Sequence, residues 1–197
     1  EPIIPGYGDV IWFMYDELAD RFRGTLKTRL KVGDWGRRSV MYSVGDNLGT
    51  WSLPRPVFLP DIIDDALAEG HSDRYTQFYG MPMVRYESVV IGLLEVFRCY
   101  DGLKSTDGFI HVELATTRDG RSWERPDRTP IIPSGDEGEW DWGLVQTGNS
   151  LVVDGDLVRV YFTGSRYRHG DKGKRKPAFG PKEDYETWQA IGMATWL

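Results

Sequence analysis

Two stretches of this chain have nearly the same pattern: Ser43-Val-Gly-Asp-Asn-Leu-Gly-Thr-Trp51 and Thr116-Thr-Arg-Asp-Gly-Arg-Ser-Trp123. In each, a β-branched run turns at an aspartate (Asp46 or Asp119), reaches a tryptophan and continues into a segment that contains proline. Aspartate and glycine are typical of tight turns, because the aspartate side chain bonds nearby backbone N–H groups and glycine tolerates a positive φ. The repeat therefore predicts one antiparallel hairpin unit that occurs at least twice.

Almost every periodic segment of the chain predicts a β-strand. The runs rich in β-branched and aromatic residues are short, and turn signals such as Asp154-Gly155 separate them. The segment Asp61–Glu69 alone predicts a helix, a short one, because acidic residues are favourable near a helix N-terminus. The sequence thus indicates an all-β protein.

Aligned on the hairpins, the chain divides into three units near residues 6–60, 74–133 and 140–197. The first two end in a short strand with a proline, which is tolerated at a sheet edge. Repeated four-stranded antiparallel units are the blades of a β-propeller, and we expect a single propeller domain over residues 1–197. A two-sheet sandwich is the competing architecture, but it does not predict such a repeat. Because propellers have about four to eight blades, we expect a processed or partial chain, with further blades supplied by the rest of the protein or by another chain.

Composition excludes several classes of partner. The 197 residues carry a net charge of −6, and the basic residues do not gather along one helix or arm, so we expect no nucleic-acid partner. No run approaches the ~20 apolar residues of a membrane span. The single cysteine, Cys99, forms no internal disulfide, and no His or Cys pair has metal-ligand spacing. We expect no membrane partner, no metal and no cofactor.

Candidate catalytic carboxylates precede the first strand of two units. Asp9 does so in the first unit, and Glu139 and Asp141 in the third. In a propeller these positions surround the central channel, and two carboxyl groups that flank one glycosidic bond can cleave it. Structural interpretations remain open: Asp9 could cap a turn, and Glu139 and Asp141 could be solvated charges of a loop.

Other side chains near the same ends suit sugar binding. Aromatic faces stack on sugar rings, which makes Tyr79, Trp140 and Trp142 candidate platforms. Gln77 and His169 are candidates for contacts to sugar hydroxyls. In the second unit Gln77 stands where a carboxylate would be convenient, with Asp73 four residues earlier.

The hairpin motif, together with Gln77-Phe-Tyr-Gly-Met-Pro82 and Trp140-Asp-Trp-Gly143, resembles the blades of five-bladed β-propeller glycoside hydrolases, as a distant relative of families 43 and 32. The resemblance implies three acids at the channel: a base or nucleophile, a transition-state stabiliser and a general acid. It places Asp9 in the first role and Glu139 or Asp141 in another. We expect Glu139 to be the general acid because its side chain reaches further, with Asp141 orienting substrate or stabilising positive charge. The turn is also similar to the Asp box of sialidases, with its spacing off by one.

Two functions follow as expectations. The first is a glycoside hydrolase that acts on a poly- or oligosaccharide through paired carboxylates at the channel. The second is a carbohydrate-binding or scaffold propeller without catalysis, which is indicated by Gln77 at the position of an acid and by the missing blades.

Overall fold

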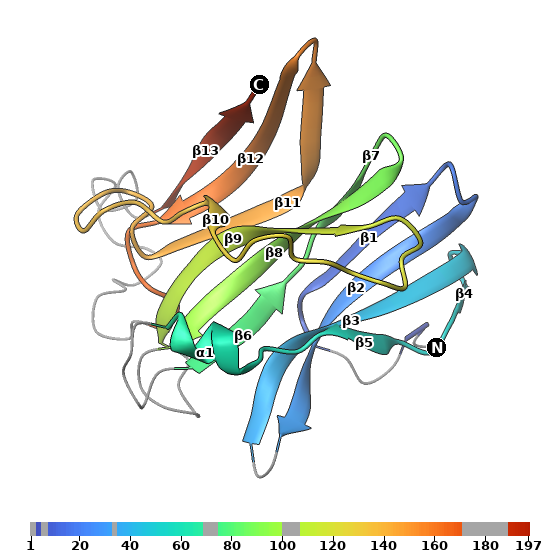
Figure 1. The fold of residues 1–197 in the computed structure, drawn as a ribbon, viewed down its shortest axis with the longest axis horizontal. Helices are drawn as coiled ribbons and strands as arrows, with labels where there is room; N and C mark the ends of the chain where they lie inside the picture. Colours follow the sequence, from blue (N-terminus) through green and yellow to red (C-terminus); the bar gives the residue numbers. More distant parts are fainter. Residues whose placement is uncertain (1–2, 5–7, 33–34, 69–74, 100–106, 171–188) are drawn as a thin grey trace, which may run out of the picture.

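The structure is a computed structural model that describes residues 3–4, 8–32, 35–68, 75–99, 107–170 and 189–197 (Figure 1). The candidate Asp73 lies outside these residues. The described part consists of two β-sheets and one short helix, and nearly all strand pairs are antiparallel. The predicted all-β, antiparallel class is therefore confirmed.

The first sheet is a meander of five strands, in the order β1-β2-β3, with β4 and β5 both paired to β3. The strands are β1 Ile11–Asp16, β2 Arg21–Val32, β3 Trp35–Asn47, β4 Thr50–Trp51 and β5 Arg55–Phe58. Pro56 lies in β5, at the edge of the sheet, where a missing N–H costs no ladder hydrogen bond. This sheet corresponds to the first predicted unit.

The second sheet has eight strands and joins the second and third predicted units. Its strands are β6 Tyr75–Gly80, β7 Met83–Tyr86, β8 Val89–Cys99, β9 Gly108–Thr117, β10 Pro130–Ile132, β11 Leu144–Asp154, β12 Leu157–Ser165 and β13 Gln189–Trp196. Strands β6 and β7 pair with the two halves of β8, and β10 pairs with β9. A short parallel pairing, Leu144 opposite Ile110, joins β11 to β9 and so makes the two units one sheet.

The connection between the two sheets carries the predicted helix, α1, which spans Ile62–Ala66. Asp61 caps it by accepting hydrogen bonds from the N–H groups of Ile63 and Asp64. Arg125 donates to the buried carboxylates of both Asp64 and Glu113, and thereby ties α1 to β9. The helix is short, so these ion pairs hold it in place rather than its own propensity.

The predicted hairpin turn at Asp119 has the expected chemistry. Its carboxylate accepts hydrogen bonds from the N–H groups of Arg121 at 2.6 Å and Ser122 at 2.8 Å, and Gly120 has a φ of +71°. The first copy differs, because Asp46 is exposed and lies 3.8 Å from Arg21. Local backbone bonding by the aspartate is thus visible in the second copy of the motif.

The middle of the molecule is the strand pair β8–β9, which is covered on both faces. On one face Val90, Leu94 and Val96 of β8 pack in a cluster with residues of the first sheet, including Val40 and Tyr42. On the other face Leu93 of β8 belongs to a second cluster that includes Val112, Ile132, Val145, Val160 and Phe162. Stacking of sheet faces therefore forms the core.

The outward faces of the first and last strand groups are uncovered and apolar. On β1 the alternate residues Ile11, Phe13 and Tyr15 are exposed, and on the last group Ile191 and Met193 are exposed. Figure 1 shows the first sheet and the last strand group, β11–β13, on opposite sides of the middle strands β8 and β9. The sheets do not close into a ring, so the propeller arrangement stays a prediction.

A buried ion cluster joins the first sheet to the middle strands. The Asp16 carboxylate at the end of β1 is fully buried and accepts hydrogen bonds from Arg23 of β2 and from Arg85 of β7. Arg23 also donates to the Tyr42 hydroxyl. Removing one member of such a cluster leaves a buried charge without its partner, which costs far more than losing a surface pair.

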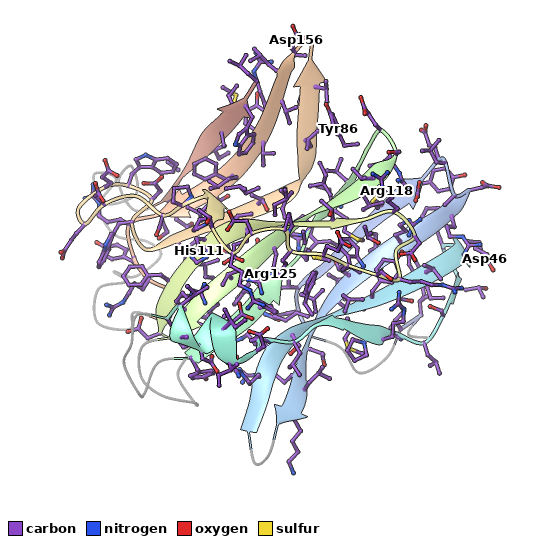
Figure 2. The ribbon with its side chains drawn as sticks, in the orientation of Figure 1. Asp46, Tyr86, His111, Arg118, Arg125 and Asp156 are labelled. Carbon is purple, nitrogen blue, oxygen red and sulfur yellow. The ribbon has the colours of Figure 1, made fainter. Side chains whose placement is uncertain are left out.

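We expect Asp16→Asn to lower the free energy of unfolding by about 3–5 kcal/mol, because two arginines lose their counter-charge in a dry interface. The measurement is urea unfolding followed by tryptophan fluorescence. The control is Asp46→Asn, which breaks the exposed ion pair with Arg21 (Asp46 is labelled in Figure 2). It should lower the free energy of unfolding by about 1 kcal/mol or less. Equal losses for the two variants would contradict this role of Asp16.

Candidate functional site

The candidate site begins where β1 begins, next to β2. The Gly8 N–H donates to the Lys27 carbonyl at 3.1 Å, and the Lys27 N–H donates to the Val10 carbonyl at 2.9 Å. This pairing places Asp9 beside Lys27, and Lys27 Nζ lies 2.7 Å from Asp9 Oδ1. Backbone pairing alone thus brings the predicted catalytic carboxylate against a cation from the neighbouring strand.

Lys27 connects this carboxylate to the second and third units. Its ammonium lies 4.0 Å from the centre of the Tyr79 ring on β6, within the range of a cation–π contact. The Tyr79 hydroxyl is hydrogen-bonded to His169 Nε2 at 3.1 Å. His169 follows β12 and is held by backbone bonds to Gly108 at the start of β9. One continuous set of contacts, which we call the axial chain (Asp9, Lys27, Tyr79 and His169), therefore spans all three predicted units.

Asp9 is the exposed end of the axial chain and carries a negative charge. Its side chain is 81% exposed, and its hydrogen bond with Lys27 is the largest cause that lowers the pKa of the carboxyl group. The carboxylate is accessible from solvent and ionised at neutral pH. These are the properties required of a base or a nucleophile.

We expect Lys27→Met to raise the pKa of Asp9 toward the ordinary value of an aspartate, because the main group that stabilises the carboxylate is removed. Carboxyl-carbon NMR titration of the two proteins measures this directly. Lys31→Met, at an exposed position of the same strand, should leave the Asp9 titration unchanged. If the pKa of Asp9 is the same in Lys27→Met as in the parent, Lys27 does not stabilise the Asp9 carboxylate.

A second carboxyl group, Glu95, lies close by but in the opposite environment. It projects from the middle of β8, is 1% exposed, and accepts a hydrogen bond from the Thr147 N–H at 3.2 Å. Burial raises its pKa to about 7, although Thr147, Gln146 and the charge of Lys27 act against this shift. Asp9 and Glu95 therefore favour opposite protonation states, and both interact with Lys27.

The raised pKa of Glu95 predicts a specific pH dependence of stability. In the unfolded chain the group titrates near 4.5, and in the folded chain near 7. Its favourable effect is complete below about pH 4.5 and is lost as the pH rises through 7, because the folded state must then hold a buried charge. We expect Glu95→Gln to be more stable than the parent by up to about 3 kcal/mol above neutral pH.

The measurement is the difference in unfolding free energy between Glu95→Gln and the parent across this pH range. The difference cancels the effects of the other carboxyl groups, which both proteins share. A difference that is the same at about pH 4 and about pH 8 would contradict the buried, protonated state of Glu95.

The structure places the other predicted residues in different surroundings. Gln77 is fully buried, where its amide donates to the Tyr75 hydroxyl at 3.2 Å and to Cys99 Sγ at 2.9 Å and accepts from the Arg38 N–H at 3.0 Å. Its hydrogen-bonding groups are used within the protein, between β6, β8 and β3. Of the predicted binding residues, Tyr79 and His169 are the pair that the structure brings together.

The predicted acids of the third unit lie in the turn before β11. Glu139 is exposed, and its carboxylate accepts a hydrogen bond from the Asp136 N–H at 2.8 Å. Asp141 is half-buried and packs beside Gly135 and Gly164. No contact between these two carboxylates and the axial chain appears among the described residues, and their catalytic roles stay predictions.

The two tryptophans of this turn pack against aromatic neighbours. Trp140 is stacked on Phe162, with the ring centres 5.6 Å apart, and Trp142 meets Phe109 edge-on at 5.1 Å. Trp140 thus belongs to the core between the second and third units. Trp142 lines a cavity of about 580 Å³ together with Arg98, His111 and Arg128.

The arginines around this cavity of about 580 Å³ form ion pairs. Arg98, Arg125 and Arg128 pair with Asp61, Asp64 and Glu113. Figure 2 shows His111 and Arg125 near one another beside β9, and His111 Nε2 lies 3.0 Å from Glu113 Oε1. Since the ion pairs connect α1, β8 and β9, we interpret the cluster as structural.

Sequence reasoning missed Lys27 and Glu95. It searched the residues before the first strand of each unit, whereas both lie within second strands. A usable signal was present for Glu95, because a glutamate in the otherwise apolar run Val89-Val-Ile-Gly-Leu-Leu-Glu-Val-Phe97 must be buried and needs a reason.

Within the described ranges, no group of three or more His, Cys, Asp or Glu side chains could hold a metal ion. The same part of the chain contains no helix with the length and apolar character to cross a membrane.

Comparison with known proteins places the fold. No protein-family model matches the chain, and no curated protein matches it in sequence. Among solved structures it is similar to an N-acetylgalactosamine deacetylase from F. plautii in complex with blood group B trisaccharide, with a TM-score of 0.61 and 16% identity over 94% of this chain and 49% of that one.

It is also similar to a structure described as a glycoside hydrolase, with a TM-score of 0.56, 12% identity, and coverage of 94% of this chain and 44% of that one. A complex of BT0996 with RGII gives a TM-score of 0.56 at 13% identity, with the same two coverages of 94% and 44%. The chain thus spans less than half of the length of these proteins. At such low identity the likeness shows a shared fold, which proteins that act on or bind carbohydrate also have.

Proposed function

We propose that the chain is part of a β-propeller glycoside hydrolase that cleaves a poly- or oligosaccharide, with its site at the axial chain. The observation that carries the proposal is the pair Asp9 and Glu95, two carboxyl groups on which the charge of Lys27 acts. One carboxyl group is exposed and ionised, and the other is buried and favours its proton. Hydrolysis of a glycosidic bond uses two carboxyl groups in these two states.

In this proposal Asp9 acts as the base or nucleophile. The sequence assigns the general acid to Glu139, with Asp141 orienting substrate, and the geometry offers Glu95 as the alternative acid because burial already holds its proton. Tyr79 and His169 would contact substrate next to Asp9, and the strand groups would be blades of a ring completed by further blades. The likeness to carbohydrate-active structures of about twice this length supports the arrangement.

We expect Asp9→Asn to lower the rate of hydrolysis by about 10³-fold, because the ionised carboxylate is removed from the reaction. The assay is release of reducing ends from a panel of polysaccharides and aryl glycosides. Asp156→Asn, at the exposed hairpin tip labelled in Figure 2, is the charge-matched control and should keep full activity.

Glu95→Gln and Glu139→Gln in the same assay decide which residue supplies the proton, since only the true acid should give a comparable loss. Hydrolysis by Asp9→Asn at the parent rate would remove Asp9 from the reaction and overturn the assignment.

A non-catalytic carbohydrate-binding propeller is the second candidate. The observation that favours it is Gln77, which fills the place of an acid in the second unit and is bonded within the protein. Binding of an oligosaccharide by the parent without release of reducing ends would establish this candidate and exclude the hydrolase.

A further inference from the structure

A cavity of about 420 Å³ lies beside Glu95, lined by residues of β1, β8, β11, β12 and β13. Its walls include Trp12 of β1, Glu95 of β8, and Gln146 and Thr147 of β11. This volume lies within the range of small-molecule sites, about 300–1,000 Å³. We call it the axial cavity.

Three buried polar atoms at the axial cavity have no hydrogen-bond partner in the described structure: Glu95 Oε2, Trp12 Nε1 and Thr147 Oγ1. Such atoms are rare in folded proteins, and each costs about 1–3 kcal/mol when left unpaired. Here they belong to residues of three different strands, all of which line one cavity. This concentration indicates that something absent from the chain completes their hydrogen bonds.

Gly80 shows how close two of these atoms are. A Cβ at this position would lie 2.7 Å from Glu95 Oε2 and 3.4 Å from Trp12 Nε1. Glycine therefore leaves room between an acceptor and a donor that a larger residue would fill. The spacing suits a group that both donates and accepts, such as a hydroxyl.

Among the described residues, the cavity offers no free cation that would pair with an anion. Glu95 is the one residue with a carboxyl or cationic group among the described lining residues, and Lys27, the cation whose charge acts on Glu95, is paired with Asp9. The aromatic side chains of Trp12 and Tyr161 line the same space and offer apolar surface. Neutral polar groups beside aromatic faces match a sugar ring, which has hydroxyls at its rim and apolar C–H faces.

We propose that the axial cavity is a subsite for a neutral sugar residue, with Glu95, Trp12 and Thr147 bonding its hydroxyl groups. This inference rests on the proposed function and names the class of sugar that the site takes. A protonated Glu95 can donate as well as accept, and no cation among the described lining residues would compensate the buried charge of a carboxylate. The site therefore discriminates neutral sugars from uronic acids.

The test is ligand-observed NMR on the purified chain with the methyl glycosides of galactose, mannose, xylose and arabinose, and with glucuronic and galacturonic acids. We expect at least one neutral glycoside to bind, and each uronic acid to bind at least about tenfold more weakly. Thr147→Val and Trp12→Phe should each lower the affinity for the neutral glycoside by about five- to tenfold, since each removes one hydrogen bond. Thr50→Val, at an exposed position of β4, is the control and should bind as the parent does.

A pH series separates a binding role of Glu95 from a merely structural one. Of the groups that face Glu95, Lys27 is charged, while Trp12, Gly80, Gln146 and Thr147 are not. Binding by the parent should therefore weaken as the pH rises above about 7, where Glu95 loses its proton. Glu95→Gln keeps a donor and an acceptor at every pH, so its affinity should stay constant.

Uronic acids that bind as tightly as neutral sugars, affinity that does not change in Thr147→Val, or no binding of any neutral glycoside would each overturn the inference. Failure of the proposed function looks different. Neutral sugar that binds through Thr147 without any hydrolysis excludes the hydrolase and keeps the subsite. Hydrolysis with an unchanged KM in Thr147→Val excludes the subsite and keeps the hydrolase.

Discussion

Each sheet of this fold must have both faces covered, because its strands carry apolar side chains on alternate sides. Among the described strands, the pair β8–β9 in the middle achieves this, with one core cluster on each face. Strand β1 and the last strand group each cover one face and leave the other exposed, as Phe13 and Ile191 show. The same constraint fixes the site, since stacking of the strand groups is what brings Lys27, Tyr79 and His169 from three units into contact. A carboxylate on an isolated sheet would have none of these neighbours.

The axial chain also shows how one cation can serve two carboxyl groups in different ways. Lys27 contacts Asp9 directly at the surface and thereby keeps it ionised. Its charge also acts on Glu95, but there desolvation has the larger effect, and the carboxyl group keeps its proton up to about pH 7. The difference comes from depth, since Asp9 precedes the first strand while Glu95 lies in the middle of a covered one. Sheets that stack face to face provide such a gradient of burial without special sequence motifs.

Local features of the fold were predictable from sequence, because they depend on neighbouring residues. The strand Leu157–Ser165, the turn at Asp119 and the helix after Asp61 follow from alternation, turn chemistry and capping. The joining of the second and third units into one sheet was not predictable. It depends on the parallel pairing of Leu144 with Ile110, which is a contact between residues far apart in the sequence. The site divides in the same way. Asp9 and His169 stand at strand ends, where sequence reasoning looks, while Lys27 and Glu95 acquire their roles through packing.

Gln77 and Glu95 illustrate why a residue type at a plausible position is weak grounds for a role. Both are fully buried polar residues of the second unit, on strands that pair with each other. Gln77 has its amide bonded on both sides, so it stabilises the packing of β6 and leaves nothing for a ligand. Glu95 has one oxygen bonded to Thr147 and the other without a partner beside a cavity. A satisfied polar group is explained by the fold that contains it, whereas an unsatisfied one next to open space requires a partner from outside. The unpaired oxygen is therefore the stronger indication of function.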